Sequence, residues 1–211
     1  YLYYAIPEPK KYKKSKNSGF RKVLTKEILT IQTGFTILIL GNVSMIVILG
    51  FYFQDKFQLN TIETARYVGI ALSVSAISQI CIQVFVLPKL KWSPRKLINC
   101  GLPLAIAATL IVMSTDSYVT IILAMVIFGM GGAVGWPAYM TASSFAAGKD
   151  NQGNVAGLTS AFQAFSFMTG PLLGTVAYQY NTFLPFYLCI FCLCLSILMA
   201  NAMKMPDLTE E

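Results

Sequence analysis

Six stretches of this sequence contain no Asp, Glu, Lys or Arg, and they restrict the possible folds more than any other feature. They cover residues 28–53, 67–87, 97–113, 118–140, 155–178 and 183–203. A helix needs roughly 17–25 apolar residues to cross the hydrocarbon core of a bilayer, and each stretch falls within or just outside that range. Because lipid offers no hydrogen-bond partners, a spanning segment must satisfy its backbone internally. The sequence therefore predicts an all-α integral membrane protein, with six transmembrane helices in one bundle over residues 28–203.

The composition supports this prediction. Only 12% of the residues are charged, about half the share of roughly 25% in a typical soluble domain. A set of buried helices in a large soluble protein would need a charged surface, which this chain does not supply. A transmembrane β-barrel would need segments of about ten residues with alternating polarity, and the sequence has none.

The distribution of basic residues predicts the orientation. If the N-terminus is cytoplasmic, fourteen of the sixteen Lys and Arg residues fall in cytoplasmic segments, and only Lys56 and Arg66 lie outside. Positive charge concentrates in the cytoplasmic loops of membrane proteins, so both termini are predicted to be cytoplasmic. The basic run at residues 10–16 could also attract anionic lipid headgroups. Nucleic-acid binding is not expected, because no folded nucleic-acid-binding module accompanies the run.

The regions outside the bundle are short. Residues 1–27 are predicted to comprise the last turns of a preceding helix, YLYYAI, followed by an IPEP exit and a basic cytoplasmic linker. Residues 204–211 are predicted to be a cytoplasmic tail. We therefore expect the sequence to be a fragment of a longer membrane protein.

The residue types argue against several kinds of chemistry. The chain has no His, and its five Cys residues all lie inside predicted spans, where a thiol behaves as a small apolar side chain. No predicted span contains a charged residue that could act as an acid or base. We therefore expect no catalytic residues, no metal site and no cofactor, and we do not expect an enzyme.

Polar side chains mark one face of several spans. In the second span, Ser75, Gln79 and Gln83 recur every four residues and so lie along one side of a helix. The third and sixth spans are almost entirely apolar and suit lipid contact. The fifth span has a polar face like that of the second, formed by Thr159, Gln163, Ser166 and Gly170. The first span carries two amides, Gln32 and Asn42.

Two interpretations of these polar faces are open. The side chains could hydrogen-bond across packed membrane helices, at about 0.6 kcal/mol each on average, or they could line a hydrated cavity that handles a solute. The sequence does not separate the two for the Ser and Thr residues. For Asn42, Gln79, Gln83 and Gln163 it favours the cavity, because a primary amide has several donors and acceptors to satisfy.

Glycine and proline are concentrated in two spans. The fourth span holds FGMGGAVGWPA, and the fifth holds TGPLLG. Small residues permit close approach of helix backbones, and proline removes a helical hydrogen bond and favours a kink. These residues could serve static packing, or the rocking of one bundle against another. They are Gly129, Gly132, Gly135, Pro137, Gly170, Pro171 and Gly174.

Residues 128–178 resemble the fourth-to-fifth span region in the C-terminal halves of major facilitator superfamily drug–proton antiporters, with tetracycline and quinolone efflux proteins nearest in pattern. The shared features are a Gly-rich helix ending in a proline, a QG pair in a short loop, a glycine at the entry to the next helix and a GP pair. The last three are Gln152 with Gly153, Gly157, and Gly170 with Pro171. Residues 51–79, FYFQDKFQLNTIETARYVGIALSVSAISQ, resemble the first extracellular loop of that half and the helix after it.

This resemblance implies a twelve-helix protein of two six-helix halves, each built from two inverted three-helix repeats, in the plasma membrane (the inner membrane of a bacterium). Its partners would be membrane lipid, the N-terminal half and a small-molecule substrate. Spans one, two, four and five would face a central cavity, and rocking of the halves would export substrate in exchange for protons. The pathway would be lined by Asn42, Ser75, Gln79, Gln83, Trp136, Thr159, Gln163 and Ser166, with Met45, Phe162 and Phe165 nearby.

Two departures from the family pattern bear on the mechanism. Some quinolone exporters carry acidic residues in the first and fourth spans of this half, whereas GNVSMIV and FGMGGAVGW have none. The loop LPKLKWSPRK keeps the positive charge of the family's G-x-x-x-D-R-x-G-R-R signature but lacks its Asp and its glycines. Proton-coupling carboxylates are therefore expected in the N-terminal half, and the substrate class stays open.

We expect a secondary active exporter of small amphipathic compounds, driven by a proton gradient. The alternatives are export of a sugar or siderophore by the same superfamily, or a six-helix subunit or channel that works without a partner half. A membrane-embedded transferase or protease would need intramembrane acids, His or a nucleophile–base pair, and nothing in this sequence supplies one.

Overall fold

The computed structural model describes residues 24–90 and 92–202, which fold into six long α-helices and no strand. A π-helical turn (Ile82–Val86) and a 3₁₀ turn (Leu87–Lys89) extend the second of them, and another 3₁₀ turn (Lys149–Asn151) precedes the fifth. The predicted end of a preceding helix and the C-terminal tail lie outside the described residues. The six helices are α2 (Lys26–Phe57), α3 (Thr61–Cys81), α4 (Pro94–Ser114), α5 (Tyr118–Ala147), α6 (Gln152–Tyr180) and α7 (Leu184–Ala202).

Most of the helices extend beyond the uncharged stretch that predicted them. The helix α2 begins two residues earlier, where the hydroxyl of Thr25 caps it, and α3 begins six residues earlier, because Asn60 and Glu63 form a capping box. The helix α5 does not end near Pro137, as the family pattern implied, but continues to Ala147. Charge therefore limits the apolar stretch but not the helix, since the end turns can carry charged groups.

The length and hydropathy of these helices fit a membrane protein. Five segments of the described chain are long and apolar enough to cross a membrane, α3 being counted together with the turns that follow it to Lys89. The 29-residue α6 is also long enough, but polar residues such as Gln152, Asn154 and Gln163 lower its hydropathy. The predicted all-α membrane fold is confirmed.

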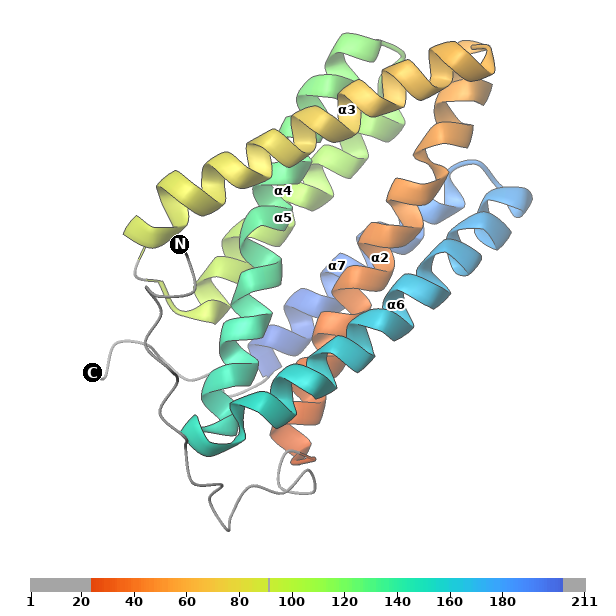
Figure 1. Cartoon of the computed structure of the whole chain (residues 1–211). Coiled ribbons are helices and arrows are strands. Elements are labelled where there is room, and N and C mark those ends of the chain that lie inside the picture. The colour runs from red at the N-terminus through yellow and green to blue at the C-terminus, as the bar shows by residue number, and fades with distance from the viewer. Residues whose placement is uncertain (1–23, 91, 203–211) are drawn as a thin grey trace, which may run out of the picture.

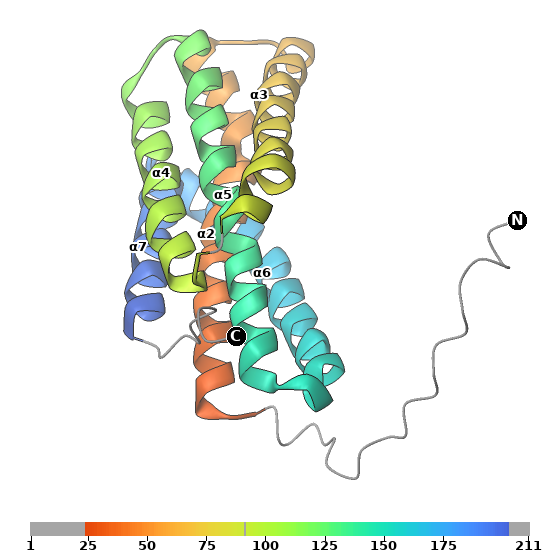
Figure 2. The same cartoon turned by 90° about the vertical axis from the view of Figure 1, so that its left-hand side faces the viewer.

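The six helices form three layers of two. Figure 2 shows α4 and α7 on the left, α2 and α5 in the middle, and α3 and α6 on the right. The chain divides into two sets of three helices, and the first helix of each set, which lies in the middle layer, packs mainly against helices of the other set: α2 contacts α6 and α7, whereas α5 contacts α3 and α4. Two inverted three-helix repeats, α2–α4 and α5–α7, produce this exchange of partners. In Figure 1 the same exchange places α3 and α6 on opposite sides of the bundle.

The two ends of the bundle differ in charge. The helices α2, α4 and α6 begin at one end, which we call the basic end, and α3, α5 and α7 begin at the other, which we call the far end. Among the described residues, basic side chains predominate at the basic end, whereas acidic and basic side chains are mixed at the far end. The basic end carries Lys26, Glu27, Lys89, Arg95, Lys96 and Asp150, and the far end carries Asp55, Lys56, Glu63, Arg66 and Asp116.

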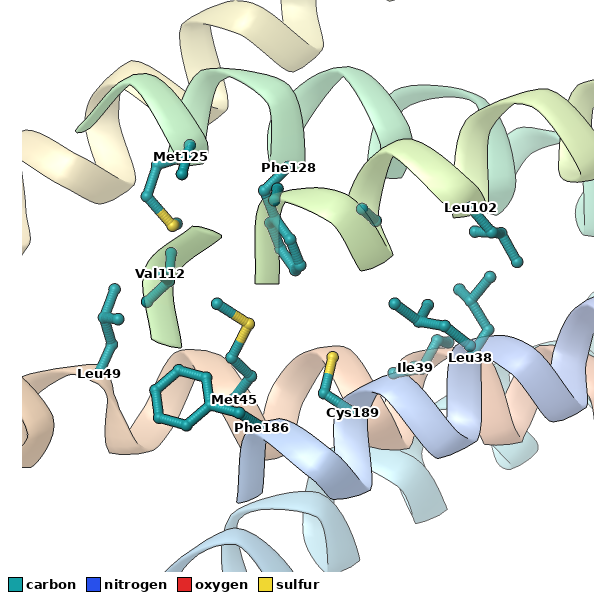
Figure 3. Close-up of a cluster of buried hydrophobic side chains, with 14 of the residues drawn as sticks. Leu38, Ile39, Met45, Leu49, Leu102, Val112, Met125, Phe128, Phe186 and Cys189 are labelled. Carbon is teal, nitrogen blue, oxygen red and sulfur yellow. The ribbon is translucent and has the colours of Figure 1, made fainter. Parts of the chain in front are cut away.

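The apolar core lies between two helix pairs, α2 with α7 and α4 with α5. Helix association inside lipid depends on close van der Waals packing rather than on exclusion of water, so this interdigitated core stabilises the bundle. By contrast, only Thr64, Ala71 and Ser78 of α3 are buried. The side chains that face one another in the core include Leu38, Met45, Leu49, Phe186, Leu102, Val112, Met125 and Phe128 (Figure 3).

Helix α3 reaches the bundle through small and polar residues. A Cβ atom added to Gly129 of α5 would lie 2.2 Å from the carbonyl oxygen of Ser75 in α3, so only glycine permits this approach. One turn further along α3, the hydroxyl of Ser78 donates a hydrogen bond to the carbonyl oxygen of Val126 at 2.9 Å. These contacts fix the position of α3 against α5 with little apolar burial.

Helix α6 contacts α2 in the same manner. A Cβ atom at Gly174 of α6 would lie 2.6 Å from the carbonyl oxygen of Ser44 in α2. The hydroxyl of Ser44 donates to the carbonyl oxygen of Gly170 at 2.8 Å. The α2–α6 and α3–α5 contacts thus use the same chemistry, as expected for related repeats.

At the basic end, polar groups join α4 to α7. Arg95 of α4 donates hydrogen bonds to the carbonyl oxygens of Ala200 and Asn201 at the end of α7. The side-chain amides of Asn99 and Asn201 exchange two hydrogen bonds, of 2.8 and 3.0 Å. The amides of the third and sixth spans, Asn99 and Asn201, therefore pair these two helices.

Candidate functional site

A cavity of about 220 Å³ lies where α2, α3 and α5 meet, with one residue of α6 at its edge. Six of the residues singled out from the sequence line it, and no residue of α4 or α7 does. Residues far apart in the chain, in spans one, two and four, therefore share one space. The lining residues are Leu38, Ile39, Asn42, Val43, Ile46, Ser75, Gln79, Phe128, Gly129, Gly132, Trp136 and Phe167.

Two primary amides line this cavity. Asn42 of α2 donates one hydrogen bond to the carbonyl oxygen of Leu38 in its own helix, at 2.8 Å, and its side-chain oxygen has no partner among the described residues. Gln79 of α3 is half-buried, and neither end of its amide is hydrogen-bonded within the described part of the chain. The amide of Gln79 is thus a donor and an acceptor available to a ligand.

Aromatic side chains form the apolar part of the wall. The indole ring of Trp136 meets Phe35 edge-on, with ring centroids 5.5 Å apart, and lies 6.3 Å from the ring of Phe167. Such contacts hold the indole in place while it remains half-buried. Phe128 completes the aromatic lining.

The described residues give this cavity no charge. Every lining residue is uncharged, and the Asp, Glu, Lys and Arg side chains of the described residues lie in the end turns of the helices or in the connections between them. Gly132 belongs to the wall rather than to a helix contact, since a Cβ atom added there would have nothing within 4 Å. The site is therefore a neutral pocket with two amides on an aromatic surface.

Gln83 is predicted to line the pathway, but the structure places it in a helix contact. It lies in the π-helical turn after α3, and its side-chain nitrogen donates a hydrogen bond to the carbonyl oxygen of Ala133 in α5 at 3.3 Å. Pro137 lacks the N–H that would otherwise bond this carbonyl. Of these two amides, therefore, only that of Gln83 has a hydrogen-bond partner in the described chain.

The polar face of α6 lies mostly against α2 rather than in the cavity. The hydroxyl of Ser166 is buried and donates to the carbonyl oxygens of Thr36 and Phe162, both at 3.1 Å. Thr159 is buried and accepts a hydrogen bond of 2.6 Å from Gln32. Of the predicted pathway residues on α6, only Gln163 is half-buried without a hydrogen bond in the described chain.

The apolar residues that were expected beside the pathway lie apart from the cavity and in two different places. Met45 is completely buried in the core between α2 and α4 and does not reach the cavity. Phe162 and Phe165 line a separate, open apolar groove of about 500 Å³ between α2 and α6, together with Thr33 and Thr36. This groove adjoins the polar α2–α6 contact.

The glycines and prolines singled out from the sequence differ in what they contact. Gly129 and Gly174 contact neighbouring backbones, as described above, and Gly135 packs against Leu102 of α4. Gly170 contacts Val43 of α2. Pro137 and Pro171 lie inside α5 and α6, which continue through them.

One buried amide has a role that the sequence did not reveal. Gln32 of α2 is completely buried, and its nitrogen donates to the hydroxyl of Thr159 and, at 3.2 Å, to the hydroxyl of Ser143. Its side-chain oxygen has no partner in the described chain. The sequence shows only that a Gln lies within a predicted span, and the fold is needed to show that its side chain links α2, α5 and α6.

Charged residues at the far end were also missed, because the uncharged stretch ends at residue 53 whereas α2 continues to Phe57. Asp55 accepts a hydrogen bond of 2.5 Å from the hydroxyl of Tyr178 in α6. The next residue of α2, Lys56, forms an ion pair with Asp116 and donates to the carbonyl oxygen of Thr115 at the end of α4. Adjacent residues of opposite charge thus join α2 to two different helices.

Comparison with known proteins agrees with this architecture. The family model described as Major Facilitator Superfamily matches residues 1–171 and, in a second and overlapping match, residues 89–207. A comparison with curated proteins found no match. The matches cover nearly all of the chain, including every helix that lines the cavity. The chain therefore belongs to the major facilitator superfamily of secondary membrane transporters.

Proposed function

We propose that this chain is the C-terminal half of a proton-driven exporter of small amphipathic compounds, and that the cavity between α2, α3 and α5 is part of its transport pathway. The observation that carries the proposal is the unpaired amide of Gln79, which shares this cavity with Asn42 and Trp136. A polar group without a protein partner is costly inside a membrane bundle. An unpaired amide at Gln79 is understandable if solvent or substrate reaches it.

The arrangement of the helices supports transport by alternating access. The helices α4 and α7 form the layer remote from the cavity and contribute nothing to its lining. In transporters of this kind, binding sites lie near the interface between repeats, and access alternates by rocking of one bundle against another. The neutral walls of the cavity also support the proposal that proton-binding carboxylates are supplied by another part of the protein, which we propose to be an N-terminal half.

Transport in proteoliposomes tests the proposal. The full-length protein would be reconstituted, an inside-acid or inside-alkaline pH gradient would be imposed, and movement of a panel of dyes, antibiotics and siderophores would be followed. We expect gradient-dependent movement of amphipathic aromatic compounds that disappears when a protonophore collapses the gradient. Movement of sugars or siderophores alone would contradict the proposed substrate class, and no movement of any compound would contradict export.

The reading frame upstream of Tyr1 tests the proposed position of this chain. Six further spans encoded there are expected for a C-terminal half. A start codon close to Tyr1 would instead support a six-helix subunit.

A further inference from the structure

We propose that this cavity recognises an uncharged aromatic ring that carries a group able both to donate and to accept hydrogen bonds, such as a carboxamide. The inference rests on the proposed function, because it takes the cavity to be a substrate site, and it names the substrate chemistry that the site selects. Three properties of the cavity carry it: its size, its lack of charge and its pairing of an amide with aromatic walls.

The size of the cavity limits what it can hold. Pockets that enclose a whole drug-sized molecule measure roughly 300–1,000 Å³, whereas this cavity measures about 220 Å³. It therefore accommodates one ring with a small substituent, which is either a whole fragment-sized ligand or one end of a larger substrate.

The lack of charge excludes ionic groups from that end. Moving an ion out of water without a counter-ion is far more costly than moving a neutral polar group. All the lining residues are uncharged, and they lie inside helices whose backbone N–H groups are already bonded, so the described part of the chain compensates neither a cation nor a carboxylate. A neutral ring with a polar substituent has no such cost.

The polar groups of the wall complement a donor and an acceptor. Gln79 offers both ends of its amide. Asn42 donates one N–H to the carbonyl oxygen of Leu38 and offers its side-chain oxygen, which no donor in the described chain bonds. A carboxamide can pair with a primary amide through two hydrogen bonds. Trp136, held edge-on by Phe35, and Phe128 supply surfaces on which a ring can stack.

The sequence itself provides a reporter for this site. The chain has two Trp residues; Trp136 lines the cavity, whereas Trp92 lies at the basic end before α4 and is 41% exposed. In a full-length protein whose other Trp residues, including Trp92, are changed to Phe, emission excited at 295 nm comes from Trp136. Three probes of nearly equal size then separate the effects of charge: benzamide, benzoate and the benzamidinium cation.

We expect benzamide to quench or shift the Trp136 emission saturably in detergent solution, with at least tenfold weaker effects of benzoate and benzamidinium. Gln79→Leu should weaken benzamide binding about tenfold, whereas Gln83→Leu, which removes an amide outside the cavity, should leave it within twofold. Gln79→Glu should reverse the preference, because the new carboxylate supplies the counter-ion that benzamidinium lacks. This last variant identifies the site by a gain of binding, which a merely unfolded protein cannot show.

Equal binding of the three probes, no saturable signal from benzamide, or unchanged preferences in both Gln79 variants would overturn the inference. The transport assay distinguishes this failure from failure of the proposed function. Gradient-dependent transport without selective benzamide binding would overturn the substrate chemistry alone. Selective benzamide binding without transport would overturn the export function and leave the binding site in place.

Discussion

The side-chain amide of Gln83 bonds the carbonyl oxygen of Ala133, which is the carbonyl that Pro137 leaves without its helical partner. The proline lies four residues after Ala133 and has no N–H, so α5 should be weakened there. An amide from the π-helical turn after α3 supplies the missing donor across the helix contact. This arrangement explains how α5 continues ten residues past Pro137 to Ala147, and why Gln83 is not available to a solute.

A double-mutant cycle tests this relationship. Gln83→Leu should lower the free energy of unfolding by about 1 kcal/mol, because it leaves the carbonyl of Ala133 unpaired inside the bundle. In a Pro137→Ala background, the new N–H of residue 137 bonds that carbonyl, so the same change at Gln83 should cost much less. Equilibrium unfolding in mixed detergent–SDS micelles measures both values. Equal losses in the two backgrounds would show that the contact is incidental.

Gln79 should behave in the opposite way to Gln83. Gln79→Leu removes an amide that has no protein partner, so it should leave the unfolding free energy unchanged or raise it slightly, and it should reduce gradient-dependent transport at least fivefold. Initial rates in proteoliposomes, corrected for the amount of inserted protein, measure this effect. Transport at the normal rate in Gln79→Leu would show that Gln79 serves helix packing and not the transport pathway.

Gln163 allows a parallel test on α6. It is half-buried and has no hydrogen-bond partner in the described chain, so Gln163→Ala should also reduce transport without reducing the amount of protein in the membrane. Ser166→Ala is the matched control on the same helix: it removes a bonded, buried hydroxyl and should lower stability by about 0.6 kcal/mol. If Gln163→Ala lowers stability and leaves transport normal, Gln163 does not face the pathway.

The fold could be predicted from the sequence because a single property, the absence of charge, marks each span. The helix ends could not, since they depend on local groups such as the Asn60 and Glu63 capping box and on charged end turns such as that of Asp55. The exchange of partners between the repeats is likewise invisible in one sequence, because periodicity shows which residues share a face but not what that face meets.

The candidate site was only partly predictable for the same reason. Gln79 and Gln83 have the same chemistry and belong to the same predicted span and face. Yet the amide of Gln79 is unbonded in the described chain, whereas that of Gln83 is bonded to the carbonyl of Ala133, fifty residues away, which Pro137 leaves unpaired. Gln32, which sits in an apolar stretch like the others, links three helices. Whether such an amide forms a helix contact or lines a cavity depends on which helix lies next to it, and only the fold shows that.

Two glycines of the same helix should respond differently to a methyl group. Gly129→Ala should destabilise the protein by about 1–3 kcal/mol, because the new Cβ would lie 2.2 Å from the backbone oxygen of Ser75 and force α3 away from α5. Gly132→Ala should be neutral or stabilising, since it meets nothing within 4 Å and alanine favours a helix. Thermal unfolding in detergent compares the two, and similar losses would show that α3 does not approach α5 so closely.

A larger residue at Gly132 should act on binding. Gly132→Phe places a ring in the cavity wall, so it should abolish ligand binding at Trp136 while the protein remains folded. The sequence alone left open whether Gly132 serves static packing or the rocking of one bundle against another; the open space beside it leads us to expect an effect on binding instead. Near-normal ligand affinity in this variant would place the binding site elsewhere.

The paired amides of Asn99 and Asn201 provide a test of the α4–α7 contact. Asn99→Leu or Asn201→Leu alone should lower the free energy of unfolding by about 0.6–1 kcal/mol, because each change leaves the other amide unpaired at the apolar surface of the bundle. The double variant should recover most of that loss, since two apolar side chains replace two polar ones and neither is left unsatisfied. The hydrogen bonds from Arg95 end on backbone carbonyls and so persist in every variant, which keeps the end of α7 fixed and lets the cycle report the amide pair. Losses that simply add in the double variant would show that the two amides do not stabilise each other.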